Sequence, residues 1–380
     1  LDALTSGDYN TAVGHQSATG ITTGSNNTAV GNESLKVATS ASNTTVMGHN
    51  AGAAITDSDN NTFIGYRAGL TNSGGSTNTA VGSDAFKVNT TGAKNTAIGY
   101  SALVSNTTAA NNTAVGMNAS GLNTTGANNT SVGYAALYTT STADNNTSIG
   151  YASLFANSTG ADNTALGSSA LYTNTTGASN TGIGKRALYA NTTGANNVGV
   201  GDKARENGTT GSSNVCLGYA AGDLLTTGGS NIMIGTSVDP AANDNTNAIV
   251  IGMGITGESN DFSFGKASNV VTNDFNSDAD WSRSSDVRLK ENIESTEVGL
   301  DFINLLRPVK FTFKDSTTVP EIMTSEYNAV NQKNTEYVSH GFIAQEVKAA
   351  LDSKGDSSFG VWELDQIDNE TQRLKKNMLI

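Results

Sequence analysis

The sequence is poor in charge, cysteine and proline, and several of these scarcities exclude a class of protein. Of its 380 residues only 14% are charged, three are proline and one is cysteine. A single cysteine, Cys216, rules out a disulfide framework within the chain. No run approaches the roughly 20 apolar residues of a membrane span, so we expect no membrane insertion. The net charge of −13 argues against nucleic acid as a partner, because nucleic acid needs a basic stripe.

What the sequence has in abundance is glycine, 42 residues of it, and much of that glycine is in strict register. One glycine recurs every seventeen residues without insertion or deletion. These register glycines are Gly14, Gly31, Gly48, Gly65, Gly82, Gly99, Gly116, Gly133, Gly150, Gly167, Gly184, Gly201, Gly218, Gly235 and Gly252. A fixed period means that each unit buries its surface against the next copy. The low charge is therefore that of a repeat scaffold and not of a disordered tail.

Each repeat has a consistent pattern around its register glycine. The preceding residues read Asn-Thr-Ala-Val, as in Asn10 to Val13, and the slot directly before the glycine is always Val, Ile, Leu or Met. We expect that slot to be a core position. A second glycine, such as Gly126, closes a Thr-Thr-Gly turn ten residues after the first. The Thr and Val content predicts two short strands per coil, with Gly and Asn at corners of positive φ. The fold class is mostly β, a parallel β-solenoid or β-roll.

The repeats also predict an assembly. Fifteen coils at a strand spacing of roughly 4.8 Å give a rod of about 70 Å. Each coil has only two or three aliphatic side chains, so a lone chain would struggle to offset its ordering entropy. We therefore expect a homotrimer of rods around one axis. Seventeen-residue spacing also predicts a column of stacked rings, structural and not a sugar platform, from Tyr138, Phe155, Tyr172 and Tyr189.

Other polar features of the rod predict no site. His15 and His49 follow register glycines but do not recur, so we expect solvated corner residues. The acidic pair Asp57 and Asp59 is not repeated in any other coil, which favours a solvated loop over a calcium site. Cys216 is expected to be a small buried hydrophobe. We expect no metal and no cofactor.

The pattern changes after Gly252, because the next comparable glycine, Gly265, comes thirteen residues later. We place the rod at residues 1–265, a polar connector at 266–281 and a small α+β domain at 282–380. The domain is expected to contain helices at 297–306 and 345–351 and strands at 308–313, 338–344 and 359–364.

Three blocks in this last domain carry a resemblance to a known family. Ser285 to Ile293 and, downstream, Ile303 to Val309 and His340 to Val347 closely resemble the C-terminal intramolecular chaperone of phage endosialidases and tail fibres. Members assist trimerisation of the β-fibre before them and then cleave themselves off. They continue into a long helix, so we expect the full gene product to be longer and this helix to be missing. The repeats resemble the heads of YadA-type trimeric autotransporter adhesins, through Asn95 to Gly99.

The chaperone resemblance implies a serine autopeptidase. Ser285 would attack the carbonyl of Ser284, so that the cut falls between these two residues. A serine hydroxyl needs a base, and Lys290 would serve once burial has lowered its pKa. His340 matches the family's histidine and would hold the geometry or support the developing charge. No turnover of an external substrate is expected.

Three functions are open at this stage. The first is a phage tail fibre, part of the virion, which would bind a host-surface glycan or protein and other tail proteins. The alternative is a trimeric adhesin on a bacterial surface. A glycan-degrading tailspike is disfavoured, because no pair of carboxylates stands in a pocket-like context.

Overall fold

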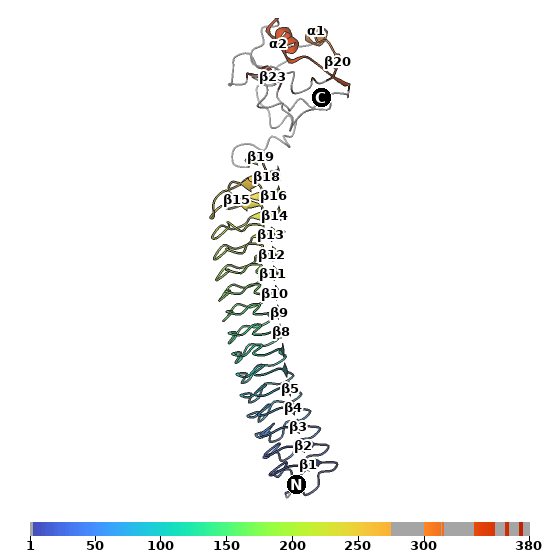
Figure 1. Cartoon of the computed structure of the whole chain (residues 1–380), viewed down its shortest axis with the longest axis vertical. Coiled ribbons are helices and arrows are strands. Elements are labelled where there is room, and N and C mark those ends of the chain that lie inside the picture. Colours follow the sequence, from blue (N-terminus) through green and yellow to red (C-terminus); the bar gives the residue numbers. More distant parts are fainter. Residues whose placement is uncertain are drawn as a thin grey trace. The chain divides into compact units, whose positions relative to one another are not determined.

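The computed structural model describes residues 3–274, 300–312, 314, 338–353, 362–364 and 372–374. The chain divides into two compact units, Leu1–Arg283 and Ser284–Ile380. The first unit is a long stack of coils whose strands form one column (Figure 1).

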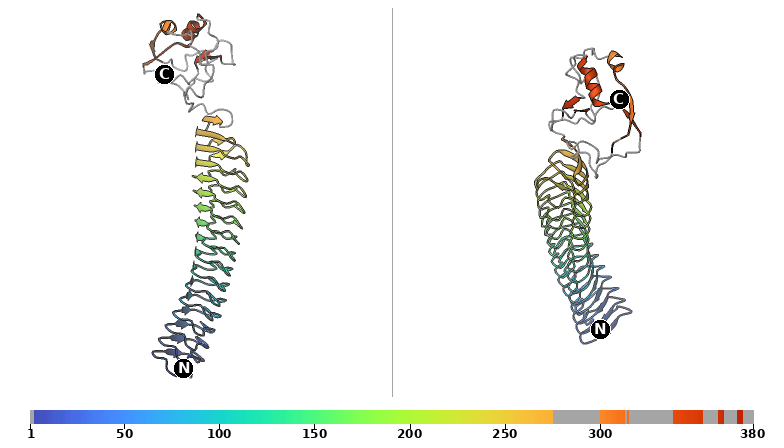
Figure 2. Two further views of the ribbon diagram at one scale, coloured as in Figure 1. Left: turned by 180° about the vertical axis from the view of Figure 1, so that it is seen from behind. Right: turned by 45° about the horizontal axis from the view of Figure 1, so that its top comes forward.

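One strand of three residues comes from each of the first thirteen coils. These strands are β1 Thr11–Val13, β2 Thr28–Val30, β3 Thr45–Met47, β4 Thr62–Ile64, β5 Thr79–Val81, β6 Thr96–Ile98, β7 Thr113–Val115, β8 Thr130–Val132, β9 Thr147–Ile149, β10 Thr164–Leu166, β11 Thr181–Ile183, β12 Val198–Val200 and β13 Val215–Leu217. Each strand pairs in parallel with the next, and the partners are one repeat apart, as with Thr130 and Thr147. The predicted parallel β-solenoid of seventeen-residue coils is confirmed, and its strands line one side of the rod (Figure 2).

The prediction of two strands per coil is wrong for these coils. After the register glycine the chain turns through residues of positive φ, such as Ala135 at 50° and Leu137 at 54°. Because these left-handed residues alternate with residues of negative φ, the segment lacks the pleat of a strand. Its amides still donate to neighbouring coils, as Leu137 N–H does to Ser153 O at 3.0 Å. The second glycine of the repeat is not at a positive-φ corner either; in the coil of Gly126 that conformation falls on Asn128, at 58°.

The slot before the register glycine is not a core position of the single chain, contrary to the prediction. In β7 it is the middle residue, Ala114, that is fully buried, while Val115 beside it is partly exposed. Successive side chains of a strand point to opposite faces, so one of these two residues must face outward. The coil interior takes the small alanine because the opposite wall already supplies a leucine.

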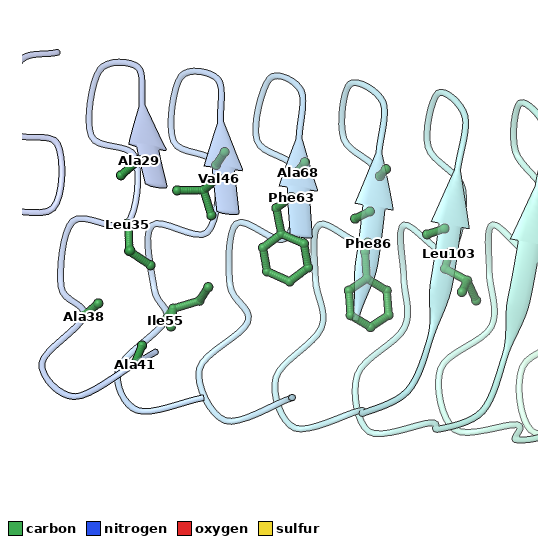
Figure 3. Packing of buried hydrophobic residues seen from close by; sticks show 14 of the residues in the cluster. Ala29, Leu35, Ala38, Ala41, Val46, Ile55, Phe63, Ala68, Phe86 and Leu103 are labelled. Carbon is green, nitrogen blue, oxygen red and sulfur yellow. The ribbon is translucent and has the colours of Figure 1, made fainter. Parts of the chain in front are cut away.

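A single chain nevertheless buries a core along the rod, in three clusters of residues. Leucine four residues after the register glycine is fully buried in coil after coil, as at Leu137, Leu154, Leu171 and Leu188. In another coil the large and the small side chain exchange places between the leucine position and the strand. Phe63, whose ring is fully buried, replaces the strand alanine (Figure 3). Gly69 replaces the leucine, and a Cβ there would lie 2.4 Å from the Phe63 ring. The premise that a lone chain cannot bury a core is therefore wrong.

Asparagine fills the rest of the interior in two ladders. In the first, Asn129 N–H donates to Asn112 Oδ1 at 2.9 Å, and Asn129 Nδ2 donates to Ala143 O at 2.8 Å. In the second, seven residues after the register glycine, Asn106 Nδ2 donates to Asn89 Oδ1 at 2.8 Å. Buried amides are stable only when their donors and acceptors are paired, and stacking identical residues provides the partners.

The rod ends in longer strands. These are β14 Ile232–Thr236, β16 Ile249–Met253, β18 Asp261–Lys266 and β19 Asn269–Asp274, with the short parallel pair β15 Asp239–Pro240 and β17 Thr256–Gly257. β19 pairs antiparallel with β18 and so closes the sheet. Residues 266–274, expected within a polar connector, are therefore in large part strand, because the Val270–Val271 segment continues the ladder.

The second unit has six described elements. They are α1 Leu300–Ile303, β20 Val309–Phe311, β21 Ser339–Gly341, α2 Ala344–Ser353, β22 Trp362–Leu364 and β23 Gln372–Leu374. The helices share a small core in which Phe302 meets Val347, Ala350 and Leu351. β20 pairs antiparallel with β21, and β22 with β23. Five of these six elements overlap the predicted helices and strands, whereas β23 lies where no element was predicted.

Candidate functional site

The implied autopeptidase residues fall only partly within the described structure. Ser284, Ser285 and Lys290 lie outside the described residues, so their predicted roles stay predictions. His340 lies in β21, where its backbone is in register with Lys310 of β20. Lys310 is therefore the backbone neighbour of the predicted histidine in this strand pair, which the sequence alone did not indicate because the two are thirty residues apart.

An ion pair links the helix that follows His340 to the residue after Leu306. Arg307 Nε donates to Glu346 Oε2 at 3.2 Å, and the second guanidinium nitrogen pairs with the other carboxylate oxygen. The hydrogen bond from Arg307 is the main reason that the pKa of Glu346 is lowered. Glu346 also lies in the first turn of α2, where the helix dipole favours a negative charge. Because both side chains are exposed, the pair contributes little to stability.

The predicted aromatic column exists on the rod. Ring centroids are 5.4 Å apart for Tyr138 and Phe155, 5.1 Å for Phe155 and Tyr172, and 5.2 Å for Tyr172 and Tyr189. The rings are within 18° of parallel, so each covers the face of its neighbour. A sugar would need a free ring face, which the inner rings of this stack do not offer. The column is confirmed as a structural feature.

The remaining polar candidates of the rod are also structural. Asp59 Oδ1 accepts a hydrogen bond from Ser42 N–H at 2.7 Å, which ties one coil to the one before it. His49 stacks on Tyr66 with centroids 5.6 Å apart. Within the described residues, no three His, Cys, Asp or Glu side chains gather as a metal site would require. Among the described helices, none has the length and apolar character to cross a bilayer.

One buried charge was not foreseen. Arg205 stands where other coils have leucine and is fully buried, and burial lowers its pKa. Its guanidinium donates to Gly211 O at 3.1 Å and fills the space beside Gly208, where a ladder asparagine would otherwise lie. Cys216 nearby is fully buried as expected, and burial raises the pKa of its thiol to about 12. That thiol is protonated at neutral pH and unreactive.

The outer face of the rod carries an unbroken apolar row. We call the residues that directly precede the register glycines, together with Phe264 before Gly265, the outer row. Every member is Val, Ile, Leu, Met or Phe, and none is buried. The most exposed members include Val13, Met47, Ile98, Ile149, Leu166 and Leu217. The sequence showed this row as a hydrophobic pattern but could not show that it faces outward.

A β-solenoid rod followed by a small α+β unit defines a fibre-like protein with a separate C-terminal domain. Residues 285–356 match the family model described as the chaperone of endosialidase, a peptidase family. The resemblance of the C-terminal blocks is therefore confirmed over this segment, whereas the likeness of the coils to adhesin heads rests on the sequence motif. No curated protein and no solved structure matches the chain.

Proposed function

We propose that this chain is the rod of a phage tail fibre, assembled as a parallel homotrimer with the help of its C-terminal unit. The observation that carries the proposal is the chaperone-family match directly after a rod of near-identical coils. Three such chains could associate one coil out of register at almost equal energy, since each coil presents the same side chains. A domain that holds the three chain ends at the same position along the rod axis removes that ambiguity.

The C-terminal unit has apolar surface suited to holding copies together. Leu300, Ile303 and Leu305 are 73%, 57% and 50% exposed, although they flank the buried Phe302. A small domain that shows this much aliphatic surface on one short segment is suited to a protein contact. The surface supports a role in bringing chains together.

The proposed release step is an acyl shift followed by hydrolysis. The Oγ of Ser285 attacks the carbonyl carbon of Ser284, and the hydroxyl proton passes to the Lys290 amine. The Ser284–Ser285 amide bond breaks, its nitrogen takes up a proton, and an ester remains. Water then hydrolyses the ester, releasing the Ser284 carboxylate and restoring the Ser285 hydroxyl. Lys290 can act as a base only where burial disfavours its charged form, so cleavage should follow assembly.

The test compares the wild type with Ser285→Ala and Lys290→Ala on a denaturing gel. The wild type should give two fragments, and each variant should give one full-length chain that still assembles, because assembly depends on packing and not on the hydroxyl. Thr125→Ala, an exposed corner of the rod, is the matched control and should cleave like the wild type. Identical band patterns for wild type and Ser285→Ala would exclude the Ser-Lys mechanism.

In this role the rod belongs to the virion and connects other tail proteins to a host-surface glycan or protein. The second candidate, a bacterial trimeric adhesin, is favoured by the Asn95 to Gly99 motif. Mass spectrometry of purified particles decides between them, because only a fibre would be found together with other tail proteins.

A further inference from the structure

We infer that the outer row is a self-association seam, along which copies of this chain pack in parallel and in register. This inference rests on the proposed function for the assembly itself and adds the face on which it occurs. The row runs through every strand of the large sheet from β1 to β18, on one side of that sheet and opposite to the face that covers the core.

The parallel arrangement of the strands is a second reason to expect that the outer face of the sheet is buried. Parallel sheets occur almost only where both faces are buried, because the crossover connections between their strands pack on those faces. Here the inner face is covered by the chain's own leucines, as at Leu154, while Ile149 on the outer face is 37% exposed. A row of aliphatic side chains that long is typical of an interface and not of a free surface.

The apolar character increases toward the C-terminal end of the rod. The outward residue two places before each outer-row residue is threonine from Thr11 to Thr181. From β12 onward it becomes aliphatic or aromatic, at Val198, Val215, Ile232, Ile249 and Phe262. The last coils therefore present two apolar columns side by side, nearest in sequence to the unit that would bring chain ends together.

The chemistry of the face selects a second copy of this chain as its occupant. Neither outward column contains a charged residue, so two identical faces can meet without like-charge repulsion. The side chains of a partner must also repeat along the rod axis at one strand spacing over the whole length of the rod. A second copy of this chain meets that requirement because it has the same repeat. Tyrosines that follow register glycines border the row and would form its rim; Tyr134 and Tyr151 stack with centroids 5.2 Å apart.

The size of the face is sufficient. Fifteen strand spacings of about 4.8 Å and a width of about 10 Å give roughly 700 Å² of projected surface per copy, close to the ~800 Å² per partner of a stable interface. A narrow flat strip of this kind can meet two others around a common axis. A parallel, in-register arrangement places each outer-row residue against its own equivalents.

Cysteine scanning tests the seam, because the only native cysteine is buried. Under mild oxidation, full-length Ile149→Cys should give covalent dimers on a non-reducing gel. Thr142→Cys, at an exposed corner of the same coil, should stay uncross-linked. In addition, Ile149→Asp should lower the assembled fraction seen by light scattering at least tenfold, and Thr142→Asp should leave it unchanged.

The outcomes separate the seam from the proposed function. A multimer that cross-links at Thr142→Cys and not at Ile149→Cys would overturn the seam and leave the fibre proposal intact. A wild-type chain that is monomeric in light scattering would overturn the proposed assembly, and the seam with it. A multimer whose mass is unaffected by Ile149→Asp would also overturn the seam, since a buried carboxylate without a partner cannot be accommodated there.

Discussion

Gly133 illustrates why glycine recurs once in every coil. Its φ is 136°, a region open only to glycine, and a Cβ there would lie 2.3 Å from the carbonyl oxygen of Gly150. Two neighbouring coils therefore approach each other too closely for any side chain. The register is thus imposed by the stacking itself. The sequence correctly predicted a positive-φ corner at this glycine and at asparagines such as Asn128.

Gly133→Ala should destabilise the rod by about 3 kcal/mol or more, because strain and a backbone clash act together. Thermal unfolding followed by circular dichroism should show a lower midpoint. Gly74→Ala is the matched control, since Gly74 is exposed and the nearest atom to its added Cβ is 3.8 Å away. The control should change stability by less than about 1 kcal/mol in either direction. Equal midpoints for both variants would contradict this account of the register.

Other conformations at the residue scale could not be predicted. Leu137 has a φ of 54°, a region where leucine is rare, and nothing in its identity signals this. Its full burial among neighbouring leucines stabilises the conformation, so the cause lies in tertiary packing. Sequence patterns report a left-handed residue only when it is Gly, Asn or Asp, and here many such positions hold other residues.

At the scale of the strand, the sequence predicted the existence and spacing of strands but not which face is inside. In Thr-Ala-Val both Ala114 and Val115 are candidates for a core, and hydrophobicity alone favours the valine. The structure buries Ala114, and where the same strand position holds the large Phe63, the leucine position is reduced to Gly69. Which strand residue faces inward depends on the space left by the side chain on the opposite wall of the coil. The strand pattern alone does not contain that information, because the residue on the opposite wall lies outside the strand.

The second asparagine ladder has a gap that can be repaired. At Thr140 the ladder is broken between Asn123 and Asn157, and Asn123 Oδ1 and Thr140 Oγ1 are buried without a hydrogen-bond partner. Thr140→Asn would place a donor against Asn123 Oδ1, as Asn106 does for Asn89 at 2.8 Å. Satisfying a buried acceptor should stabilise the rod by about 1–3 kcal/mol.

Chemical denaturation measures this change, and Asn106→Thr is the mirror control. That variant introduces the same gap into an intact ladder, so its midpoint should fall by a similar amount as the midpoint of Thr140→Asn rises. A Thr140→Asn midpoint at or below that of the wild type would show that the ladder is not a source of stability.

At the scale of the whole molecule, the two units make complementary contributions. The rod repeats the same outward face along its length, which in the proposed trimer would give strong association but no unique register. The C-terminal unit, matched to the endosialidase chaperone over residues 285–356, is the element that can define one. Sequence motifs found this unit without structural help. The geometry of Ser285 and Lys290 could not be derived from them, since two residues five apart have no fixed separation until their backbone conformation is known.

The central claim is that three chains share one rod and that each is cut before Ser285. Native mass spectrometry of the purified full-length expression product, followed by intact-mass measurement after denaturation, tests both parts at once. The account predicts a complex of three chains, each ending at Ser284. A single uncut chain of 38.9 kDa under native conditions would contradict it.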